Sequence, residues 1–275
     1  MSATTDTMPD LSTEYALDAA QVAAYRKDGH VVLRGLCTPA EIAAYRRVLV
    51  AGVDRMNQEK RKMEDRDTYG KAFLQIMNLW RTDEAIQRYV LAHRFAKVAA
   101  KLMGVSGVRL YHDQALFKEP GGGHTPWHQD QQYWPLDTDN TITMWMPLHD
   151  ITQTMGTMNF ASGSHTTGYL GSMPISDESE EIFNAFVRDK GFGVINHGDM
   201  RGGDATFHTG WTLHSAPPNS TPNMREVMTI IYYADGTKLL PPDSPSREAD
   251  LRAWFPGQEA GETAASAINP LVYSE

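Results

Sequence analysis

A histidine and an aspartate two residues apart, His128 and Asp130, stand within the segment WHQDQQYW. On an extended strand, residues i and i+2 point to the same face, so both side chains can reach one metal ion. A second pair with this spacing, His197 and Asp199, lies in INHGDMRGGD, where the glycines predict a turn that does not fix side-chain direction. We therefore expect the first pair to bind the metal.

A third ligand must come from a distant strand. His214 lies far enough beyond Asp130 for several strands to intervene, whereas barely one hairpin separates it from Asp199. His208 competes for the same role, although Gly210 interrupts the run between the two histidines. Two histidines and one carboxylate leave adjacent positions of an octahedral ion open, which is typical of Fe(II) oxygenases, while zinc more often takes a tetrahedral set.

Arg225 opens the strand-like segment REVMTIIYY, which follows His214 after a Pro/Asn/Ser-rich loop. A guanidinium binds a carboxylate through two parallel hydrogen bonds, so Arg225 can hold one end of a dicarboxylate whose other end is on the metal. The alternative is a structural ion pair with Glu226 or with an acidic loop. Together with the metal ligands, the binding role is favoured.

These residues belong to a chain of 275 residues with a net charge of −9, 41% hydrophobic residues and 21% charged residues. This composition is globular, and the negative charge argues against nucleic acid or an anionic membrane surface as the main partner. Cys37 is the only cysteine, which excludes an internal disulfide framework, and we expect it to be structural. No apolar run is long enough for a membrane span and no signal peptide is evident, so we expect a soluble, cytoplasmic protein.

The first part of the chain has helical patterns. Residues 1–13 are Ser/Thr-rich and acidic, and we expect them to be disordered. The segment HVVLRGL is predicted to be a strand. Helices are predicted, from their spacing and capping residues, over 17–29, 38–56 and 83–104.

The sequence pattern changes near residue 105. Short β-rich runs separated by Gly, Pro, Asn and Asp continue to about residue 236, which predicts a sandwich or jelly-roll barrel rather than alternating βαβ units. A helix over 176–190 interrupts them, capped by Ser176 or Asp177. It is a candidate lid, although a packing insertion is favoured. The Pro-rich tail over 237–275 is predicted to be irregular.

The order of several segments resembles the phytanoyl-CoA dioxygenase family of Fe(II)/2-oxoglutarate-dependent oxygenases. The segments are LDAAQVAAYRKDGHVVLRGL, WHQDQQYWP, MGTMNFASGSH, GDATFHTGWTLHSAPPNST and REVMTIIYYADG. The resemblance implies a mainly β fold with flanking helices and a double-stranded β-helix (jelly-roll, cupin-like) core. It implies one oxygenase domain over 14–275, with a helical part over 14–104, the jelly roll over 105–236 and the tail over 237–275.

The resemblance also implies roles for individual side chains. Fe(II) would be bound by His128, Asp130 and His214. The cosubstrate 2-oxoglutarate would be bound by Arg225, Gln114 and Trp145. Many relatives carry Ser or Thr two residues after the distal histidine, where this chain has Ala216, so that hydroxyl is missing or is supplied by Thr212 or Ser215. Halogenating relatives replace the carboxylate by a small residue, and the intact Asp130 argues against halogenation.

The expected reaction consumes O₂ and 2-oxoglutarate and releases succinate and CO₂, with hydroxylation as the default and desaturation, epoxidation or ring closure as alternatives. The expected substrate is a small metabolite or natural-product intermediate, because no basic stretch suits an acyl-CoA. Candidate substrate-lining residues are Trp134, Tyr133, Phe207, Gln75 and Met158. The rival functions are a cupin-like non-redox metal-binding protein and a metal-dependent isomerase or hydrolase. The oligomeric state, monomer or homodimer, is open.

Overall fold

The computed structural model of the chain describes residues 8–275. All pairings between its named strands are antiparallel. The strands are β1 His30–Leu33, β2 Leu74–Met77, β3 Gly107–Phe117, β4 Thr125–His128, β5 Thr141–Pro147, β6 Asn159–Ala161, β7 Val194–Asn196, β8 Ala205–Thr209, β9 His214–Ala216, β10 Val227–Ala234 and β11 Leu271–Ser274.

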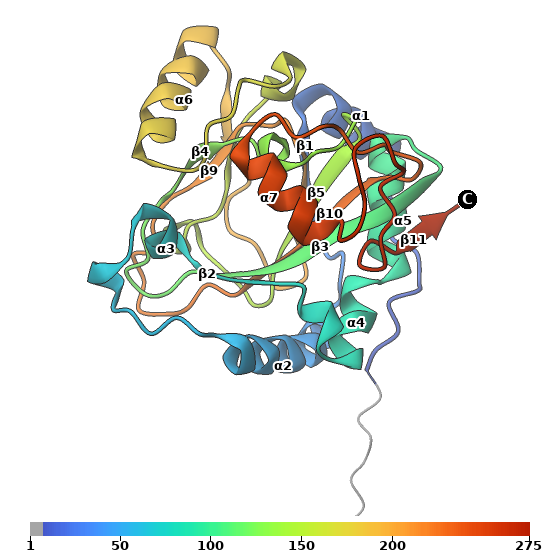
Figure 1. Cartoon of the computed structure of the whole chain (residues 1–275). Coiled ribbons are helices and arrows are strands. Elements are labelled where there is room, and N and C mark those ends of the chain that lie inside the picture. Colours follow the sequence, from blue (N-terminus) through green and yellow to red (C-terminus); the bar gives the residue numbers. More distant parts are fainter. Residues whose placement is uncertain (1–7) are drawn as a thin grey trace, which may run out of the picture.

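The strands form two sheets. The larger sheet has the order β1-β8-β5-β10-β3-β11, and β2 pairs with the other end of β3. The smaller sheet has the order β4-β9-β6-β7. Figure 1 shows β4 and β9 to one side of β3, β5 and β10. Strands that are neighbours in a sheet are distant in sequence, which is the crossed connectivity of the predicted jelly-roll core.

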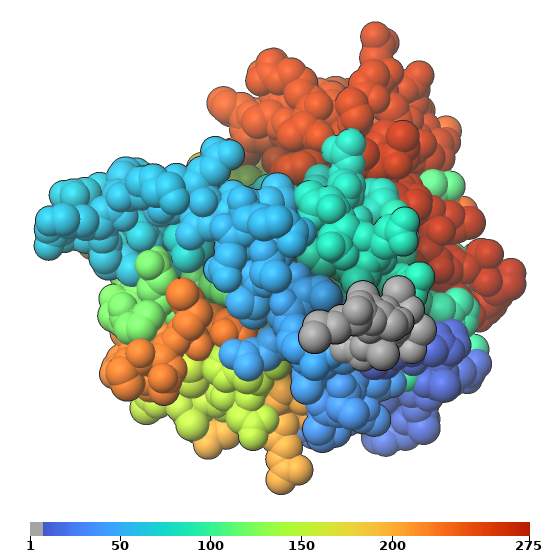
Figure 2. All heavy atoms as spheres, turned by 90° about the horizontal axis from the view of Figure 1, so that it is seen from below, coloured from blue at the N-terminus to red at the C-terminus, as the bar shows by residue number. Residues whose placement is uncertain are grey.

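Helices flank the two sheets. The α-helices are α1 Ala19–Asp28, α2 Pro39–Met56, α3 Thr68–Ala72, α4 Glu84–Val90, α5 His93–Met103, α6 Asp177–Lys190 and α7 Pro245–Trp254. The 3₁₀ helices are η1 Met63–Asp65, η2 Leu79–Arg81, η3 Asp130–Tyr133, η4 Gln153–Met155 and η5 Ser164–Thr167. Helix α5 contacts β3, β5, β10 and β11, and α2 lies beside α4 (Figures 1 and 2). Within residues 8–275, no helix is long and apolar enough to cross a membrane.

Two helices begin at the residues that the sequence indicated. The Thr38 hydroxyl accepts a hydrogen bond from the Glu41 backbone N–H at 3.2 Å, and Pro39 occupies the first turn of α2. Ser176 caps α6 in the same way, through a 3.1 Å bond from the Ser179 N–H. Such side chains satisfy backbone donors that have no partner inside the first turn, which fixes where each helix starts.

The third predicted helix, over 83–104, is instead two helices, α4 and α5. Ala92 between them has an extended backbone (φ −62°, ψ 123°). The buried Arg94 guanidinium just beyond it donates to the Leu36 carbonyl oxygen at 3.0 Å and pairs with Glu41 at 2.9 Å. The break thus orients α5 so that Arg94 reaches partners distant in sequence, which local helical periodicity could not reveal.

The prediction of disorder for residues 1–13 covers two segments, of which the structure describes one. Residues 1–7 lie outside the described residues. Residues 8–13 are ordered against the fold, which corrects the prediction for this part. The Leu11 side chain is buried, and its carbonyl oxygen accepts a 3.2 Å hydrogen bond from the Arg94 N–H. Tyr45 also donates to the Pro9 carbonyl oxygen at 2.6 Å, and Arg94 donates to the Thr13 carbonyl oxygen at 2.7 Å. These contacts with distant residues order the backbone, and overall composition does not reveal them.

The C-terminal tail is also more regular than predicted. It contains α7, which begins after the capping residue Ser244 and has Pro245 in its first turn, and β11, which pairs with β3. Phe255, just after α7, is buried beside the rings of Tyr111 and Tyr233. Contacts with these rings and with β3 therefore hold the tail against the larger sheet.

Phe207 on β8 is fully buried in the core between the larger sheet and the helices. It pairs in register with Met144 of β5, which lies in the same core, whereas the next residue, His208, pairs with Thr143. Because alternate residues of a strand face opposite sides, His208 and Thr143 point between the two sheets and Phe207 points away. The prediction that Phe207 lines a substrate site is therefore wrong.

We predict that Phe207→Ala lowers the free energy of unfolding by about 3–5 kcal/mol, because it leaves a cavity in a close-packed core. Urea denaturation measures this loss. The control Leu271→Ala removes an exposed side chain on β11 and should change the stability by no more than about 0.5 kcal/mol. Equal losses in the two variants would contradict the orientation of β8.

Candidate functional site

His128 and His214 are direct partners in the smaller sheet. His128 is the last residue of β4, His214 is the first residue of β9, and the two are in register with ring centroids 4.1 Å apart. Both side chains are buried. Strand pairing thus brings together two imidazoles that are distant in sequence, and both face the larger sheet.

Asp130 does not continue the strand that the sequence predicted. Strand β4 ends at His128, and Asp130 begins η3. The backbone N–H of Gln131 donates to the Gly210 carbonyl oxygen at 3.0 Å, which holds this turn against the chain just after β8. The i, i+2 spacing therefore brings the two side chains together through a strand end and a tight turn rather than through a pleat.

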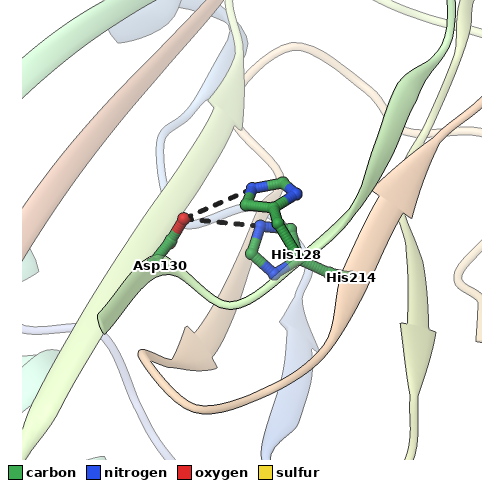
Figure 3. Close-up of side chains that lie close together, drawn as sticks. All are labelled: His128, Asp130 and His214. Atoms are coloured by element: carbon green, nitrogen blue, oxygen red, sulfur yellow. Dashed lines mark ion pairs between the residues drawn. The ribbon is translucent and has the colours of Figure 1, made fainter. Parts of the chain in front are cut away.

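The three side chains converge, as Figure 3 shows. The Oδ1 atom of Asp130 lies 3.5 Å from Nε2 of His128 and 3.6 Å from Nε2 of His214. The three ligand atoms all lie within 4.8 Å of one another. Among residues 8–275, this is the one group of three or more His, Cys, Asp or Glu side chains close enough to share a metal ion.

The orientation of each histidine is set by a backbone carbonyl. Nδ1 of His128 is 2.8 Å from the Pro126 oxygen, and Nδ1 of His214 is 2.9 Å from the Thr212 oxygen. A carbonyl oxygen only accepts hydrogen bonds, so both Nδ1 atoms carry the proton. Each Nε2 atom is therefore left with a lone pair that faces the other two ligands, as metal-binding histidines require.

The second oxygen of Asp130 is held from the larger sheet. The Thr143 hydroxyl donates to Oδ2 at 2.9 Å, and His208 donates from Nε2 at 3.2 Å. Thr143 and His208 are cross-strand partners on β5 and β8. His208, the competing distal ligand, thus contacts the oxygen of Asp130 that faces away from His128 and His214. Sequence reasoning missed this role, because it depends on which strands are neighbours.

The ionisation of the group suits a divalent cation. Burial alone would raise the pKa of Asp130, but His214, His128 and His208 outweigh it and lower that pKa well below its usual value. Burial, followed by the neighbouring His128, lowers the pKa of His214 well below its ordinary value. An ionised carboxylate oxygen and neutral imidazole nitrogens form a mixed O/N donor set that fits Fe(II).

A cavity of about 280 Å³ lies beside these three side chains and is also lined by Arg225. Arg225 is 2% exposed, its Nη1 donates to the Gly156 carbonyl oxygen, and its guanidinium lies 5.3 Å from the centroid of the Trp145 ring. Among residues 8–275, no carboxylate is paired with it. Glu226, the alternative partner that the sequence suggested, is bound by Arg46.

Burial lowers the pKa of Arg225 to about 9, so the guanidinium remains largely charged at neutral pH. Its Nε atom is buried and has no hydrogen-bond partner among the described residues. A buried cation without a countercharge is costly. An anionic ligand bound beside Arg225 would therefore neutralise a buried positive charge that is already in place.

The other predicted cosubstrate residues line the same cavity. Gln114 and Trp145 are both paired in register with Thr229 of β10, so the three form one row across the larger sheet. At Ala216 the cavity wall lacks a hydroxyl. Ser215 lines the cavity, whereas Thr212 donates its hydroxyl proton to the Gly29 carbonyl oxygen at 2.8 Å, so of the two candidates only Ser215 borders the cavity.

Four of the five predicted substrate residues line the cavity. They are Gln75, Tyr133, Trp134 and Met158. Gln75 accepts a hydrogen bond from Tyr69 at 2.7 Å, and Tyr133 accepts one from the Ile175 N–H at 3.0 Å. The sequence favoured Trp134 over Tyr133 from strand alternation. That preference is wrong, because η3 replaces the strand and both side chains border the cavity.

The second His-x-Asp pair lies elsewhere. Nε2 of His197 is 3.0 Å from Nδ1 of His30, and the Asp199 carboxylate accepts a hydrogen bond from the Gln153 N–H at 2.9 Å. Neither side chain belongs to the group of potential metal ligands. The turn predicted around these residues is consistent with Gly198, which has a φ of +78°.

Helix α7 contributes two cavity residues that the sequence reasoning did not identify, Asp250 and Trp254. The Tyr111 hydroxyl donates to Oδ2 of Asp250 at 2.7 Å, and the Trp254 ring packs 4.8 Å from that of His112. The irregular tail predicted from the sequence did not include this helix. The pair Ser244-Pro245 was an available signal, because Ser at the cap and Pro in the first turn are typical of a helix start.

Comparison with known proteins places these features in a family. The family model described as phytanoyl-CoA dioxygenase (PhyH) matches residues 25–227. A probable alpha-ketoglutarate-dependent hypophosphite dioxygenase from Stutzerimonas stutzeri is 27% identical over 158 residues, which cover 55% of this chain and 54% of that relative. The chain thus spans about half the length of that relative. An ectoine dioxygenase from Bordetella bronchiseptica is 24% identical, with 82% of this chain and 79% of the relative covered.

Among solved structures, the epimerase SnoN in complex with Fe³⁺, alpha ketoglutarate and nogalamycin RO superposes with a TM-score of 0.73 at 24% identity. That match covers 92% of this chain and 97% of the SnoN chain, and it supports the jelly-roll fold. The resemblance seen in the sequence motifs is confirmed by the family match, which covers most of the chain. The chain therefore belongs to the phytanoyl-CoA dioxygenase family.

Proposed function

We propose that the protein is an Fe(II)- and 2-oxoglutarate-dependent dioxygenase that hydroxylates a small-molecule metabolite or natural-product intermediate. The reaction consumes O₂ and releases succinate and CO₂. The observation that carries this proposal is a single cavity lined both by the ligand group and by the buried Arg225, which has no paired carboxylate among the described residues. A non-redox metal-binding barrel or a hydrolase gives no reason for that unpaired cation.

In this proposal His128, Asp130 and His214 bind the iron through two Nε2 atoms and Oδ1. The iron, when bound with 2-oxoglutarate and O₂, supplies the oxidation of the substrate C–H bond. Thr143 and His208 fix the orientation of Asp130 through its other oxygen. The intact carboxylate of Asp130 favours hydroxylation over halogenation, because halogenating relatives would have a small residue at this place.

Arg225 binds the distal carboxylate of 2-oxoglutarate, since its guanidinium is buried and positively charged. Trp145 packs against the guanidinium and limits its movement. Gln114 is held by a hydrogen bond from Gln75, so both amides are oriented in the cavity before a ligand arrives. Ala216 carries no hydroxyl, and of the two candidates for that role, Ser215 and Thr212, Ser215 borders the cavity.

The remaining cavity side chains exclude water and orient the substrate. Tyr133, Trp134 and Met158 provide the apolar wall beside the ligand group. Displacing water strengthens the electrostatic interactions inside the cavity and protects the reaction from hydrolytic side paths. We assign residues 14–275 to one oxygenase domain. We place the enzyme in the cytoplasm, because its single cysteine, Cys37, is a buried free thiol, which suits a reducing compartment.

We predict that His128→Ala abolishes iron binding and succinate production, whereas His197→Ala leaves both nearly unchanged. The first change removes a nitrogen of the ligand group, and the second alters only contacts with the rings of His30 and Phe160. Anaerobic addition of Fe(II) and 2-oxoglutarate should give a weak visible charge-transfer absorption in the His197 variant and none in the His128 variant. The opposite pattern would refute the choice of ligands.

A substitution at His208 tests whether this residue orients Asp130 or binds the iron itself. We predict that His208→Ala weakens iron affinity by about 10–100-fold without abolishing it, as is usual when a group that orients a metal ligand is lost. Metal titration followed by the same visible absorption measures the effect. If iron binding were lost as completely as in His128→Ala, His208 would be a ligand itself.

We predict that Arg225→Ala raises the 2-oxoglutarate concentration needed for half-saturation by about 30-fold or more, because truncating a buried, charged hydrogen-bonding partner costs about 2–5 kcal/mol. Iron affinity should change far less. Arg46→Ala is the matched control, since Arg46 pairs with Glu226, the residue next to Arg225. Parallel losses of iron and 2-oxoglutarate affinity in Arg225→Ala would indicate a structural arginine.

A further inference from the structure

Asp250 provides a second charged group in the cavity, and the proposed function does not use it. It projects from α7, beside Trp254 of the same helix. Its carboxylate accepts a 2.7 Å hydrogen bond from Tyr111 and a further side-chain hydrogen bond from Trp254. Both donors are neutral, so they orient the carboxylate without neutralising its charge.

No cation within residues 8–275 forms an ion pair with Asp250. Arg247, one turn earlier on α7, already pairs with Asp243 at 3.1 Å, donates to the Gln132 carbonyl oxygen at 3.2 Å and lies over the Tyr169 ring. Burial raises the pKa of Asp250 to about 7, which reflects the cost of a carboxylate without a positive partner. A cationic ligand in the cavity would remove that cost.

The surroundings of Asp250 are aromatic. The aromatic side chains that line the same cavity include Tyr69, Phe73, Tyr133, Trp134 and Trp254. The faces of such rings attract alkylammonium groups, and the attraction grows when the cation is shielded from water. A carboxylate with aromatic walls is a chemical environment that selects a protonated or quaternary amine over a neutral group of the same shape.

Asp250 and Arg225 both line the cavity, but they come from separate parts of the chain and have different contacts. Arg225 packs on Trp145, which is in one row with Thr229 and Gln114 across the larger sheet. His112 lies two residues before Gln114 on β3, and its ring packs against Trp254 of α7. The Arg225 guanidinium thus contacts Trp145, whereas the Asp250 carboxylate contacts Tyr111, so the cationic group is suited to the 2-oxoglutarate carboxylate and the anionic group to a different molecule.

We propose that Asp250 recognises an alkylammonium group of the oxidised substrate, so that the substrate class is a small molecule bearing a protonated or quaternary amine. This inference rests on the proposed function, because it assigns Arg225 to 2-oxoglutarate. Tyr111 acts as a positioning residue that aims the Asp250 carboxylate. The amine end binds among the aromatic side chains, and the carbon to be hydroxylated extends toward the three metal ligands.

The test compares matched probes on the anaerobic Fe(II)·2-oxoglutarate complex of the full chain. Benzylammonium is paired with benzyl alcohol, and choline with its carbon isostere 3,3-dimethylbutan-1-ol. Isothermal titration calorimetry should show the cation of at least one pair binding about tenfold or more tightly than its neutral partner. Asp250→Asn should abolish this preference, because the amide keeps the shape and loses the charge.

The control variant is Glu248→Gln, which removes one negative charge from the exposed face of the same helix. It should keep the preference for the cation. An equal preference in wild type and Asp250→Asn, or no preference in either pair, overturns the proposal. The visible absorption of the Fe(II)·2-oxoglutarate complex is recorded in every sample. Its absence in wild type would instead overturn the proposed function, so the two failures are distinguishable.

A pH titration tests the same contact even if Asp250→Asn fails to fold. Choline keeps its charge at all pH values, so its affinity for wild type should rise as pH increases through about 7 and Asp250 ionises. The titratable groups that interact with Asp250 are Tyr111, Tyr69 and Tyr133. His112, whose ring packs on Trp254, and Arg247, one turn earlier on α7, are the neighbouring groups to consider with them. Burial lowers the pKa of His112 to about 3 and raises those of the three tyrosines, that of Tyr133 to about 12.

None of these tyrosines nor His112 changes charge between pH values of about 6 and 8, and an arginine stays protonated. A choline affinity that does not change across this range overturns the proposal. A rise in affinity that is absent for 3,3-dimethylbutan-1-ol supports it. The neutral probe serves as the internal control for any general effect of pH on the fold.

Discussion

The pairing of β4 with β9 is the constraint on which the rest of the site depends. It sets His128 directly opposite His214. Each ring is then held by the carbonyl of the residue two positions earlier in the chain, Pro126 or Thr212. Because this carbonyl contact occurs on both paired strands, the Nε2 lone pairs of His128 and His214 point toward the same place. A shift in this register would separate them and leave Asp130 without its partners.

One face of the larger sheet contacts the metal-ligand group, and its other face packs in the hydrophobic core. On β8, His208 faces Asp130 while Phe207 packs under the helices. On β5, Thr143 contacts Asp130 while Met144 packs beside Phe207. Because the two faces alternate along the same backbone, the packing that stabilises the domain also fixes the groups that orient the carboxylate.

The sequence predicted those parts of the site that depend on residue type and local spacing. The pair His128 and Asp130, the distal His214 and the basic Arg225 could be selected from motifs, and the structure brings them to one cavity. The capped helices and the short antiparallel strands were also predictable. The sequence could not predict the contact between His208 of β8 and the second oxygen of Asp130, because that contact depends on which strands are neighbours.

Other differences have similar causes. Phe207 was placed in the site because the face of β8 that meets the helices is not evident from a five-residue strand. The break between α4 and α5 depends on the distant partners of Arg94. Residues 8–13 are ordered by the buried Leu11 and by hydrogen bonds from Tyr45 and Arg94. The composition of the tail suggested irregular chain, although its serine-proline signal marked α7.

The placement of α7 has a consequence for how such enzymes diversify. The family match ends at residue 227, whereas α7 spans Pro245–Trp254 and still reaches the cavity. One part of the cavity wall, formed by Asp250 and Trp254, therefore lies outside the stretch that matches the family and contains the three potential metal ligands. Substitutions in α7 can therefore change the shape and charge of this part of the cavity without altering His128, Asp130 or His214.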